Sequence, residues 1–384
     1  MGQLIELQKA LSASAVYTFS IGNLIMIGIA LVMMYMSYRR HAEPLLLIPL
    51  AFGMIISNIP PISSGLFAAP HLVNGVMIPG GLMYYIEQGM FSGIYPPLIF
   101  LGIGAITDFS FVLASPILFL IGGAAQIGIM IAFLAANAVG FNIFQSASIG
   151  IIGGADGPTT IFVTSHLAPK ILGTVAVAAY TYIALIPFIE PPIQWLFTTK
   201  KERLIRMKQQ RVVSKTEKMI FPVATTLITG ILVPKALPLI GMLMLGNLLY
   251  EIPLTKRLAD TSGHALLDTV DILLMLSVGG TTRASTFLTP ATLKIMGLGI
   301  LAFACSLAGG VLFVKFLNLF LKNKINPLIG AAGVSAVPDA ARVAQQMAQK
   351  DDPHNFILMQ AMGPNVAGVI GSALVAGVFL SLLR

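Results

Sequence analysis

Apolar stretches of about twenty residues recur from one end of this chain to the other, and they restrict its possible folds more than any other feature. A helix needs about 20 apolar residues to cross a hydrocarbon core roughly 30 Å thick. Windows of this kind cover residues 17–38, 116–139, 171–197, 295–314 and 356–383. Only 10% of the residues are charged and 56% are hydrophobic, whereas about a quarter are charged in soluble domains. We expect a multi-pass protein of the inner (cytoplasmic) membrane, with about ten spans or half-spans.

One acidic residue interrupts this apolar sequence. Asp156 lies in the segment GGADGPTT, residues 153–160. A carboxylate at membrane depth costs roughly 2.5 to 3.5 kcal/mol or more, so it usually persists because something binds it. The neighbouring glycines and proline break helical hydrogen bonding, and a broken helix at depth frees carbonyl groups to line a cavity. The pattern predicts a cation site with Asp156 as its acid.

The same organisation occurs twice along the chain. Residues 101–110 (LGIGAITDFS) align with residues 276–285 (LSVGGTTRAS). In each half an apolar span, a Gly- and Ala-rich break and another apolar span follow, so that Asp156 corresponds to Ser335. Paired broken segments in two halves indicate a transporter site, because inverted repeats bring such segments together near the membrane midplane. Chance similarity between apolar sequences is the alternative explanation.

These features predict an all-α polytopic membrane protein with two repeats, inverted relative to each other, and with paired broken helices or re-entrant segments at the midplane. The N-terminal repeat covers residues 1–197, with its break around Asp156, and a basic loop covers 198–218. The C-terminal repeat covers 219–384, with its break at 326–342.

The net charge of +8 is mostly loop charge, so we expect no nucleic-acid partner. The positive-inside rule places the basic loop in the cytoplasm. Docking of a soluble acidic partner is a second reading of the same charge.

The second break carries polar residues of its own. Asn326 and Ser335 offer neutral oxygens, and Gly330 allows close backbone approach. Arg342 is a permanent cation, which at membrane depth requires an anion. That anion is either an anionic substrate or Asp339, which would be adjacent on a helix.

The two breaks together resemble a known family. The segments GGADGPT (153–159), NPLIG (326–330) and GVSAVP (333–338) are similar to motifs of the β subunits of sodium-pumping biotin-dependent decarboxylases. That family comprises the oxaloacetate, methylmalonyl-CoA, glutaconyl-CoA and malonate decarboxylase systems. The resemblance covers almost the whole chain, except the ends and the basic loop. It implies carboxybiotin decarboxylation coupled to sodium export, with the biotin supplied on a partner carrier protein and not attached to this chain.

The resemblance also implies which residues bind sodium, the only metal ion that we expect. Asp156 would bind the ion and reach alternately toward the two faces of the membrane. The other implied ligands are Asn326, Gly330, Ser335 and Asn365.

Four residues are implied in catalysis: Asp156, Tyr182, Ser335 and Arg342. Tyr182 falls where the family has a tyrosine in the ion or proton path, and Tyr182 or Ser335 could donate the proton that completes the reaction. A packing residue with a satisfied hydroxyl is the other reading of Tyr182. Arg342 is the candidate for the carboxybiotin carboxylate. Many family members have an apolar residue where this chain has Asp339, a departure that leaves an Asp339–Arg342 pair open.

The implied partners form a larger complex. They are a biotin carrier protein or domain, a carboxyltransferase α subunit, a small single-span γ or δ subunit, further copies of this chain in a homo-oligomer, and membrane lipid. A secondary sodium-coupled carboxylate transporter or a sodium/proton exchanger would use the same paired broken helices. Only the decarboxylase reading requires a partner that carries biotin.

Overall fold

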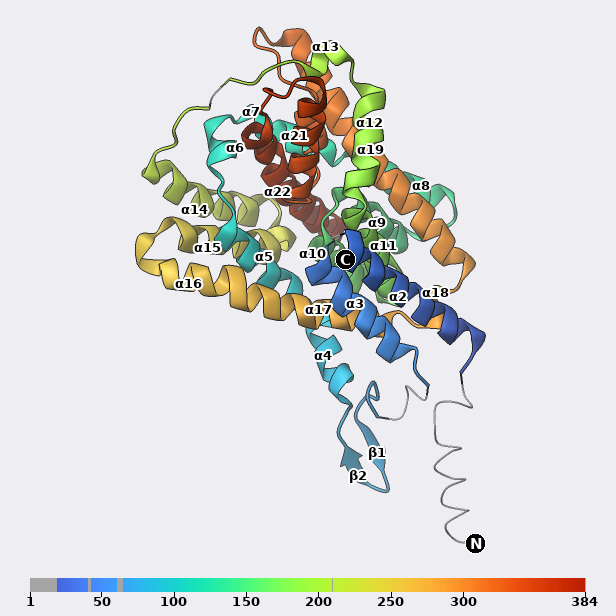
Figure 1. Cartoon of the computed structure of the whole chain (residues 1–384). Helices are drawn as coiled ribbons and strands as arrows, with labels where there is room; N and C mark the ends of the chain where they lie inside the picture. Colours follow the sequence, from blue (N-terminus) through green and yellow to red (C-terminus); the bar gives the residue numbers. More distant parts are fainter. Residues whose placement is uncertain (1–18, 41–42, 61–64, 209, 384) are drawn as a thin grey trace.

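The computed structural model describes residues 19–40, 43–60, 65–208 and 210–383. The first eighteen residues of the predicted N-terminal repeat, with the start of the 17–38 window, lie outside this range. The described chain is an assembly of helices with one small hairpin (Figure 1).

The N-terminal half contains most of its helices in short, interrupted pieces. These are α2 (Ile21–Arg40), α3 (Pro44–Ser57), α4 (Leu82–Phe91), α5 (Tyr95–Ile106), α6 (Ser110–Ala114), α7 (Ile117–Ala125), α8 (Ile127–Ala138), α9 (Ile143–Gly150), the 3₁₀ turn η2 (Ile151–Gly154), α10 (Gly157–Leu167), the 3₁₀ turn η3 (Pro169–Ile171), α11 (Leu172–Ala184) and α12 (Ile186–Phe197).

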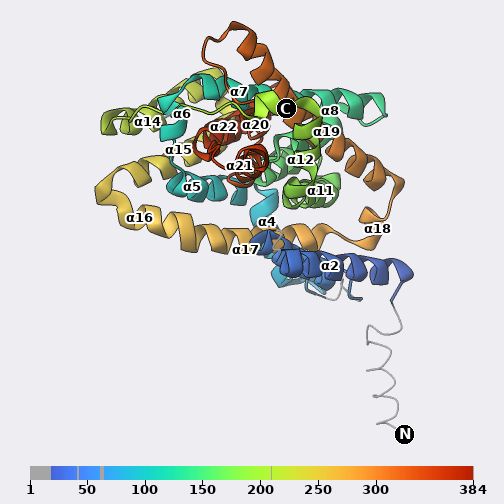
Figure 2. The same ribbon diagram turned by 45° about the horizontal axis from the view of Figure 1, so that its top comes forward.

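The C-terminal half follows the short helix α13 (Lys200–Arg203) of the basic loop. Its elements are α14 (Lys215–Leu232), η4 (Pro234–Ala236), α15 (Leu237–Glu251), η5 (Pro253–Thr255), α16 (Lys256–Thr261), the π-helical turn η6 (Ser262–Leu266), α17 (Leu267–Thr281), α18 (Ala284–Phe287), α19 (Pro290–Phe320), α20 (Leu328–Ala331), α21 (Asp339–Asp351) and α22 (Leu358–Leu383). In two views, α14, α15 and α16 lie on one side and α8 on the other, with α21 and α22 between them (Figures 1 and 2).

Five described helices are long and apolar enough to cross a membrane: Ile21–Arg39, Ile117–Ala138, Pro253–Thr281, Pro290–Phe320 and Leu358–Leu383. Two bent pairs qualify when each is taken as one span, which gives up to seven. The pairs are Leu82–Phe91 with Tyr95–Ile106, bent by 68°, and Pro169–Ala184 with Ile186–Phe197, bent by 67°. The described part of the chain thus has multi-pass character, with broken helix pairs, as the sequence predicted.

A small hairpin departs from the all-α prediction. Strands β1 (His71–Val73) and β2 (Val76–Ile78) pair antiparallel, with His71 opposite Ile78. Asn74 and Gly75 form the turn, both with positive φ, as two-residue hairpin turns require. The strands have only three residues each, so the sequence carried little periodic signal for them.

The two halves exchange helix contacts. Helix α3 of the first half packs against α17 of the second, and α15 of the second half packs against α5 of the first. The two segments that align in the sequence, residues 101–110 and 276–285, begin in α5 and α17. In each pair, therefore, one of the two aligned helices, α5 or α17, packs against a helix of the other half.

Glycines permit the close approach of these helix pairs. A Cβ atom at Gly104 of α5 would overlap the α15 backbone, and one at Gly246 of α15 would overlap the α5 backbone. Gly53 of α3 and Gly279 of α17 have the same relation in the other pair. Gly104 and Gly279 occupy equivalent positions in the two aligned segments. Small residues are the usual means of close helix packing in membranes.

Matching amide contacts close the ends of α5 and α17. The Asn247 amide donates to the Thr107 carbonyl (2.9 Å), and the Asn58 amide donates to the Thr282 carbonyl (2.8 Å). Each threonine directly follows its helix, where a carbonyl lacks a helical partner. The two contacts agree with the alignment of Thr107 with Thr282 in the sequence.

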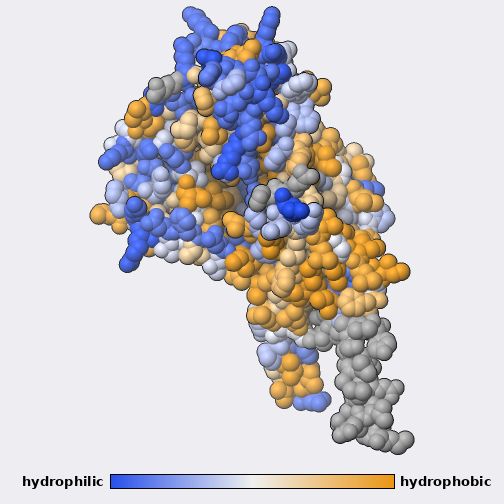
Figure 3. Space-filling model, in the orientation of Figure 1, coloured by the Kyte–Doolittle hydropathy of each residue, from blue (hydrophilic) through white to orange (hydrophobic). Residues whose placement is uncertain are grey.

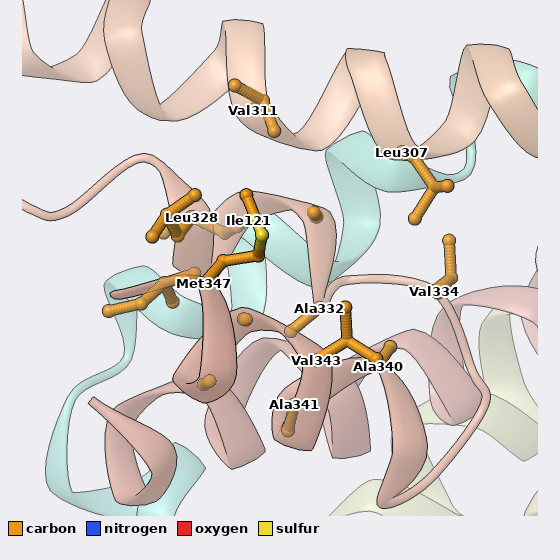
Figure 4. Close-up of a cluster of buried hydrophobic side chains, with 14 of the residues drawn as sticks. Ile121, Leu307, Val311, Leu328, Ala332, Val334, Ala340, Ala341, Val343 and Met347 are labelled. Atoms are coloured by element: carbon orange, nitrogen blue, oxygen red, sulfur yellow. The ribbon is translucent and has the colours of Figure 1, made fainter. Parts of the chain in front are cut away.

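A buried hydrophobic cluster holds the second break in place. Side chains from α7, α19, α20 and α21 meet around the turn between α20 and α21 (Figure 4). Leu307 of α19 lies over Val334, with Ala340 and Val343 of α21 on the other side of it, and Val311 lies over Leu328 and Ile121. The small residues on this face of α21 let it pack closely, so the break is fixed between two helices.

We expect Gly104→Ala to destabilise the protein by at least about 1–3 kcal/mol, because its methyl group would overlap the α15 backbone. Thermal unfolding of the detergent-solubilised protein would measure the loss. Gly297→Ala in α19 is the matched control, since no described atom lies within 4 Å of its new methyl group. Equal melting temperatures for the two variants would contradict a tight α5–α15 contact.

Candidate functional site

Asp156 lies where the first broken helix changes direction. The turn η2 ends at Gly154, Ala155 follows it with a left-handed φ of 52°, and α10 then begins at Gly157. Asp156 caps α10, with its Oδ1 accepting a hydrogen bond from the Thr159 backbone N–H (3.0 Å). Pro158 fits the first turn of α10, because the backbone N–H that proline lacks would have no helical partner there. Capping uses one carboxylate oxygen and leaves the other directed at the second half of the protein.

The second break meets the first directly. The Ser335 backbone N–H donates to the Gly154 carbonyl (2.9 Å). The Ser335 hydroxyl lies 3.1 Å from the Ser372 hydroxyl of α22, which donates to Asp156 Oδ2 (2.7 Å). Asp156 and Ser335, which the sequence alignment of the two halves pairs, are therefore joined through Ser372.

Asn365 of α22 holds the backbone of the second break. Its amide Nδ2 lies within hydrogen-bonding distance of the carbonyls of Ala332 (3.0 Å), Val334 (2.7 Å) and Ala336 (3.2 Å). Seven residues separate Asn365 from Ser372, so both lie on one face of α22. One helix face thus contacts both breaks.

Several buried oxygens near the two breaks have no hydrogen-bond partner among the described residues. They are Gln126 Oε1, Asn365 Oδ1 and the Tyr180 hydroxyl. Gln126 separates α7 from α8, and its Nε2 approaches the Gly333 carbonyl at 3.4 Å. The Tyr180 ring lies against Gly157, where a Cβ atom would overlap it. Unpaired buried oxygens are costly unless something binds them.

This oxygen-lined site contains one carboxylate. The described residues include no cluster of three or more His, Cys, Asp or Glu side chains that could hold a metal ion. Asp156 is 6% exposed, and neutral oxygens surround it. A single negative charge balances a single positive charge, so this donor set suits a monovalent hard cation or a proton.

Tyr182 is turned toward a different part of the protein. Its hydroxyl donates to the Met296 carbonyl of α19 (2.6 Å), so this buried hydroxyl is satisfied. Tyr180, which precedes Tyr182 by two residues on α11, is the tyrosine whose ring lies beside Gly157. The structure therefore brings Tyr180, and not the Tyr182 hydroxyl, to the first break.

Asn326 and Gly330 lie at the start of the second break. The Asn326 amide donates to the Arg203 and Ile205 carbonyls of the basic loop, both at 2.9 Å, and its Oδ1 accepts the Leu328 N–H (3.1 Å). Gly330 packs so tightly on α19 that a Cβ atom would overlap it. In this arrangement both residues anchor the break, and they contact neither Asp156 nor Ser372.

Arg342 lies on the outer side of α21. Its guanidinium is 3.4 Å from Asp339 Oδ1, and its side chain is 62% exposed. Asp339 also lies near the Glu43 carboxyl group. Arg342 thus has a long, exposed contact with Asp339 and remains accessible to another anion.

Reasoning from sequence did not find Ser372, Gln126, Tyr180 or Thr159. Ser372 stands in an apolar, Gly-rich helix, where a serine resembles a small packing residue. Gln126 had a usable signal, since an amide in the middle of the 116–139 window is unusual at membrane depth.

Comparison with known proteins gives the family. Residues 22–383 match the family described as Na⁺-transporting oxaloacetate decarboxylase beta subunit. Methylmalonyl-CoA decarboxylase subunit beta of Propionigenium modestum is 51% identical over 381 residues, which cover 95% of this chain and 96% of that protein. Glutaconyl-CoA decarboxylase subunit beta of Acidaminococcus fermentans is 47% identical, with 99% and 98% covered. Oxaloacetate decarboxylase beta chain 2 of Salmonella typhi is 44% identical, with 94% of each covered. The chain, with one buried acid between two joined breaks, belongs to the family of Na⁺-transporting decarboxylase beta subunits.

Proposed function

We propose that the chain decarboxylates carboxybiotin and couples this reaction to sodium export across the cytoplasmic membrane. The observation that carries the proposal is the Ser335–Ser372–Asp156 contact, which joins the two breaks at a buried carboxylate. Biotin is presented by a partner carrier protein. A carboxyltransferase α subunit, a small single-span γ or δ subunit and further copies of this chain complete the complex.

Sodium, as the transported substrate, binds between the two breaks. The Ser372 hydroxyl lies 2.7 Å from Asp156 Oδ2 and 3.0 Å from the Val369 carbonyl. When the hydroxyl donates to Val369, its lone pairs and Asp156 Oδ2 both become available to a cation. Ser335 and Asn365 supply further neutral oxygens. Asn326 and Gly330, the other ligands implied by the resemblance, would have to leave their present contacts to take part.

Proton exchange at Asp156 couples the ion to the reaction. A desolvated carboxyl group retains a proton unless a cation compensates its charge, so arriving sodium displaces that proton. Cleavage of the carboxybiotin N–C bond releases CO₂ and leaves an electron pair on the ureido nitrogen, which takes up one proton. Ser335, bonded to Ser372, is a candidate donor of that proton. Tyr182, the other candidate, would first have to leave its hydrogen bond to the Met296 carbonyl. Exclusion of water from the carboxylate favours the loss of CO₂.

Transport requires Asp156 to face the two sides of the membrane in turn. We propose that the two halves are inverted repeats that rock against each other around the joined breaks. The exchanged pairs α3–α17 and α5–α15 support this arrangement, since equivalent helices make equivalent contacts. The cation site would remain near the midplane while access changes.

Reconstitution in liposomes tests the proposal. The purified chain receives carboxylated biotin carrier protein, and CO₂ release and sodium flux are measured together. We expect both activities to depend on carboxybiotin and on sodium. Sodium flux without carboxybiotin would instead indicate a secondary sodium-coupled carboxylate transporter or a sodium/proton exchanger.

Asp156→Asn should abolish sodium-coupled decarboxylation while the protein remains folded. Loss of the charge opposite a buried cation costs about 3 kcal/mol or more, which is a decrease of about a hundredfold. Turnover and sodium flux in liposomes would measure the effect, with unchanged detergent melting as the control for folding. Near-normal coupled activity in this variant would remove Asp156 from the mechanism.

Ser372→Ala and Ser335→Ala should each raise the sodium concentration for half-maximal rate about fivefold. Loss of one neutral oxygen costs about 1 kcal/mol, and the maximal rate should change less. Ser381→Ala is the matched control, because its hydroxyl bonds only within α22, to the Gly377 carbonyl (2.8 Å). An unchanged sodium dependence in both variants would exclude the two hydroxyls as ligands.

Arg342→Lys should lower carboxybiotin turnover roughly tenfold, because a lysine cannot offer two parallel hydrogen bonds to a carboxylate. Sodium binding, measured as protection from heat, should persist. Asp339→Asn is the comparison, because it removes the carboxylate that forms the only ion pair of Arg342 among the described residues. Equal losses in both single variants, no further loss in the double variant and unchanged carboxybiotin affinity would reduce Arg342 to a structural ion pair.

A further inference from the structure

The acidic side chains in and beside the basic loop form ion pairs with arginines and with Lys315. Within the loop and its neighbours, Arg203 pairs with Asp351, Arg206 with Asp352, Arg211 with Glu217, and Lys315 with Glu202. The Arg211 hydrogen bond lowers the pKa of Glu217 to about 2, so this pair stays ionised at neutral pH.

Lysines remain in excess on the same surface. Among the residues that the structure describes, no carboxylate lies within ion-pair distance of Lys200, Lys201, Lys208, Lys215, Lys322 or Lys324. All of these lysines are exposed. Hydrophilic residues gather at the end of the molecule where α13 lies (Figures 1 and 3). The surface therefore carries an uncompensated positive charge.

Four of these lysines, Lys201, Lys208, Lys322 and Lys324, line two hollows that share Lys324 and Ile205, and we call the two hollows together the cationic groove. One hollow, of about 520 Å³, lies between the loop and the 321–325 turn and is lined by Lys208, Lys322 and Lys324. The other, of about 560 Å³, is lined by Lys201 and again by Lys324. A concave surface of this size can receive projecting side chains of another protein.

The basic loop, which forms one wall of the groove, is hydrogen-bonded to the second break and to α22. Amides of Asn326 and Asn355 donate to the Arg203 carbonyl, both at 2.9 Å. The Gln360 amide of α22 donates to the Lys208 carbonyl (3.0 Å). Asn326 begins the second break, and Gln360 shares α22 with Ser372. A protein bound in the groove would thus contact a segment attached to both elements of the cation site.

We propose that the cationic groove is the docking surface for an acidic face of the carrier protein that presents carboxybiotin. This inference rests on the proposed function. Arg203 of the loop pairs with Asp351, the last residue of α21, and Arg342 lies nine residues earlier on that helix, about 14 Å along its axis. A carrier seated in the groove can extend a flexible arm to Arg342. Complementary charge would accelerate its encounter and set its orientation.

The test compares two forms of the substrate. Lys201→Glu/Lys322→Glu reverses one exposed lysine in each hollow, and Lys256→Glu/Lys294→Glu makes the same charge change outside the groove. The full-length protein in detergent receives either carboxylated carrier protein or free carboxybiotin. We expect the groove variant to raise the KM for the carrier roughly tenfold, with kcat retained at saturation. Turnover of free carboxybiotin should match the wild type, and the control variant should match it with both substrates.

Three results would overturn the docking surface. The first is an unchanged KM for the carrier in the groove variant. The second is an equal loss with free carboxybiotin, which would indicate damage to the site itself. The third is a defect that appears only in phosphatidylcholine vesicles containing phosphatidylglycerol, which would identify lipid headgroups as the occupant. If the wild type turns over neither substrate, the proposed function fails; if it turns over both and the carrier KM does not shift, only the docking surface fails.

Discussion

The contact between the two breaks is the constraint on which the other features depend. The Ser335 amide donates to the Gly154 carbonyl, and Ser372 joins Ser335 to Asp156. Both breaks have left the helical hydrogen-bond pattern, and backbone groups freed at membrane depth must find partners within the protein. Groups of the two breaks form hydrogen bonds with each other, and they do so beside Asp156, the one carboxylate of the site. Any movement that separates them must therefore supply new partners for these groups.

Close backbone packing holds the breaks in register. The hydrophobic effect does not drive helix association within lipid, so small residues and interhelical hydrogen bonds take its place. Gly330 meets Gly310 of α19 with both backbones in contact, which fixes the start of the second break. The α5–α15 and α3–α17 pairs use the same device in the surrounding helices. Contacts of this kind hold each helix pair together as one unit.

Local chemistry determined what could be predicted from the sequence. Asp156 stood out in the sequence because the cost of a carboxylate at membrane depth depends only on its apolar surroundings, and it lies where the two breaks meet. Asn365 was assigned only through the resemblance, and it binds the backbone of the second break. Ser372 and Tyr180 depend on tertiary packing, because the direction of a hydroxyl on an apolar helix follows from helix rotation. Tyr182 illustrates the same limit: it shares α11 with Tyr180 but points to α19.

Asn326 connects the second break, which borders the proposed cation site, with the cytoplasmic surface that the positive-inside rule predicts. Its amide holds the Arg203 and Ile205 carbonyls of the basic loop, and its Oδ1 holds the first turn of α20. If Asn326 left these contacts to bind an ion, both carbonyls would lose a partner and the loop would be released. Coupling of this kind is reciprocal. A partner that stabilises the loop in its bound position must favour the arrangement in which Asn326 anchors it, and sodium binding that recruits Asn326 must weaken that partner.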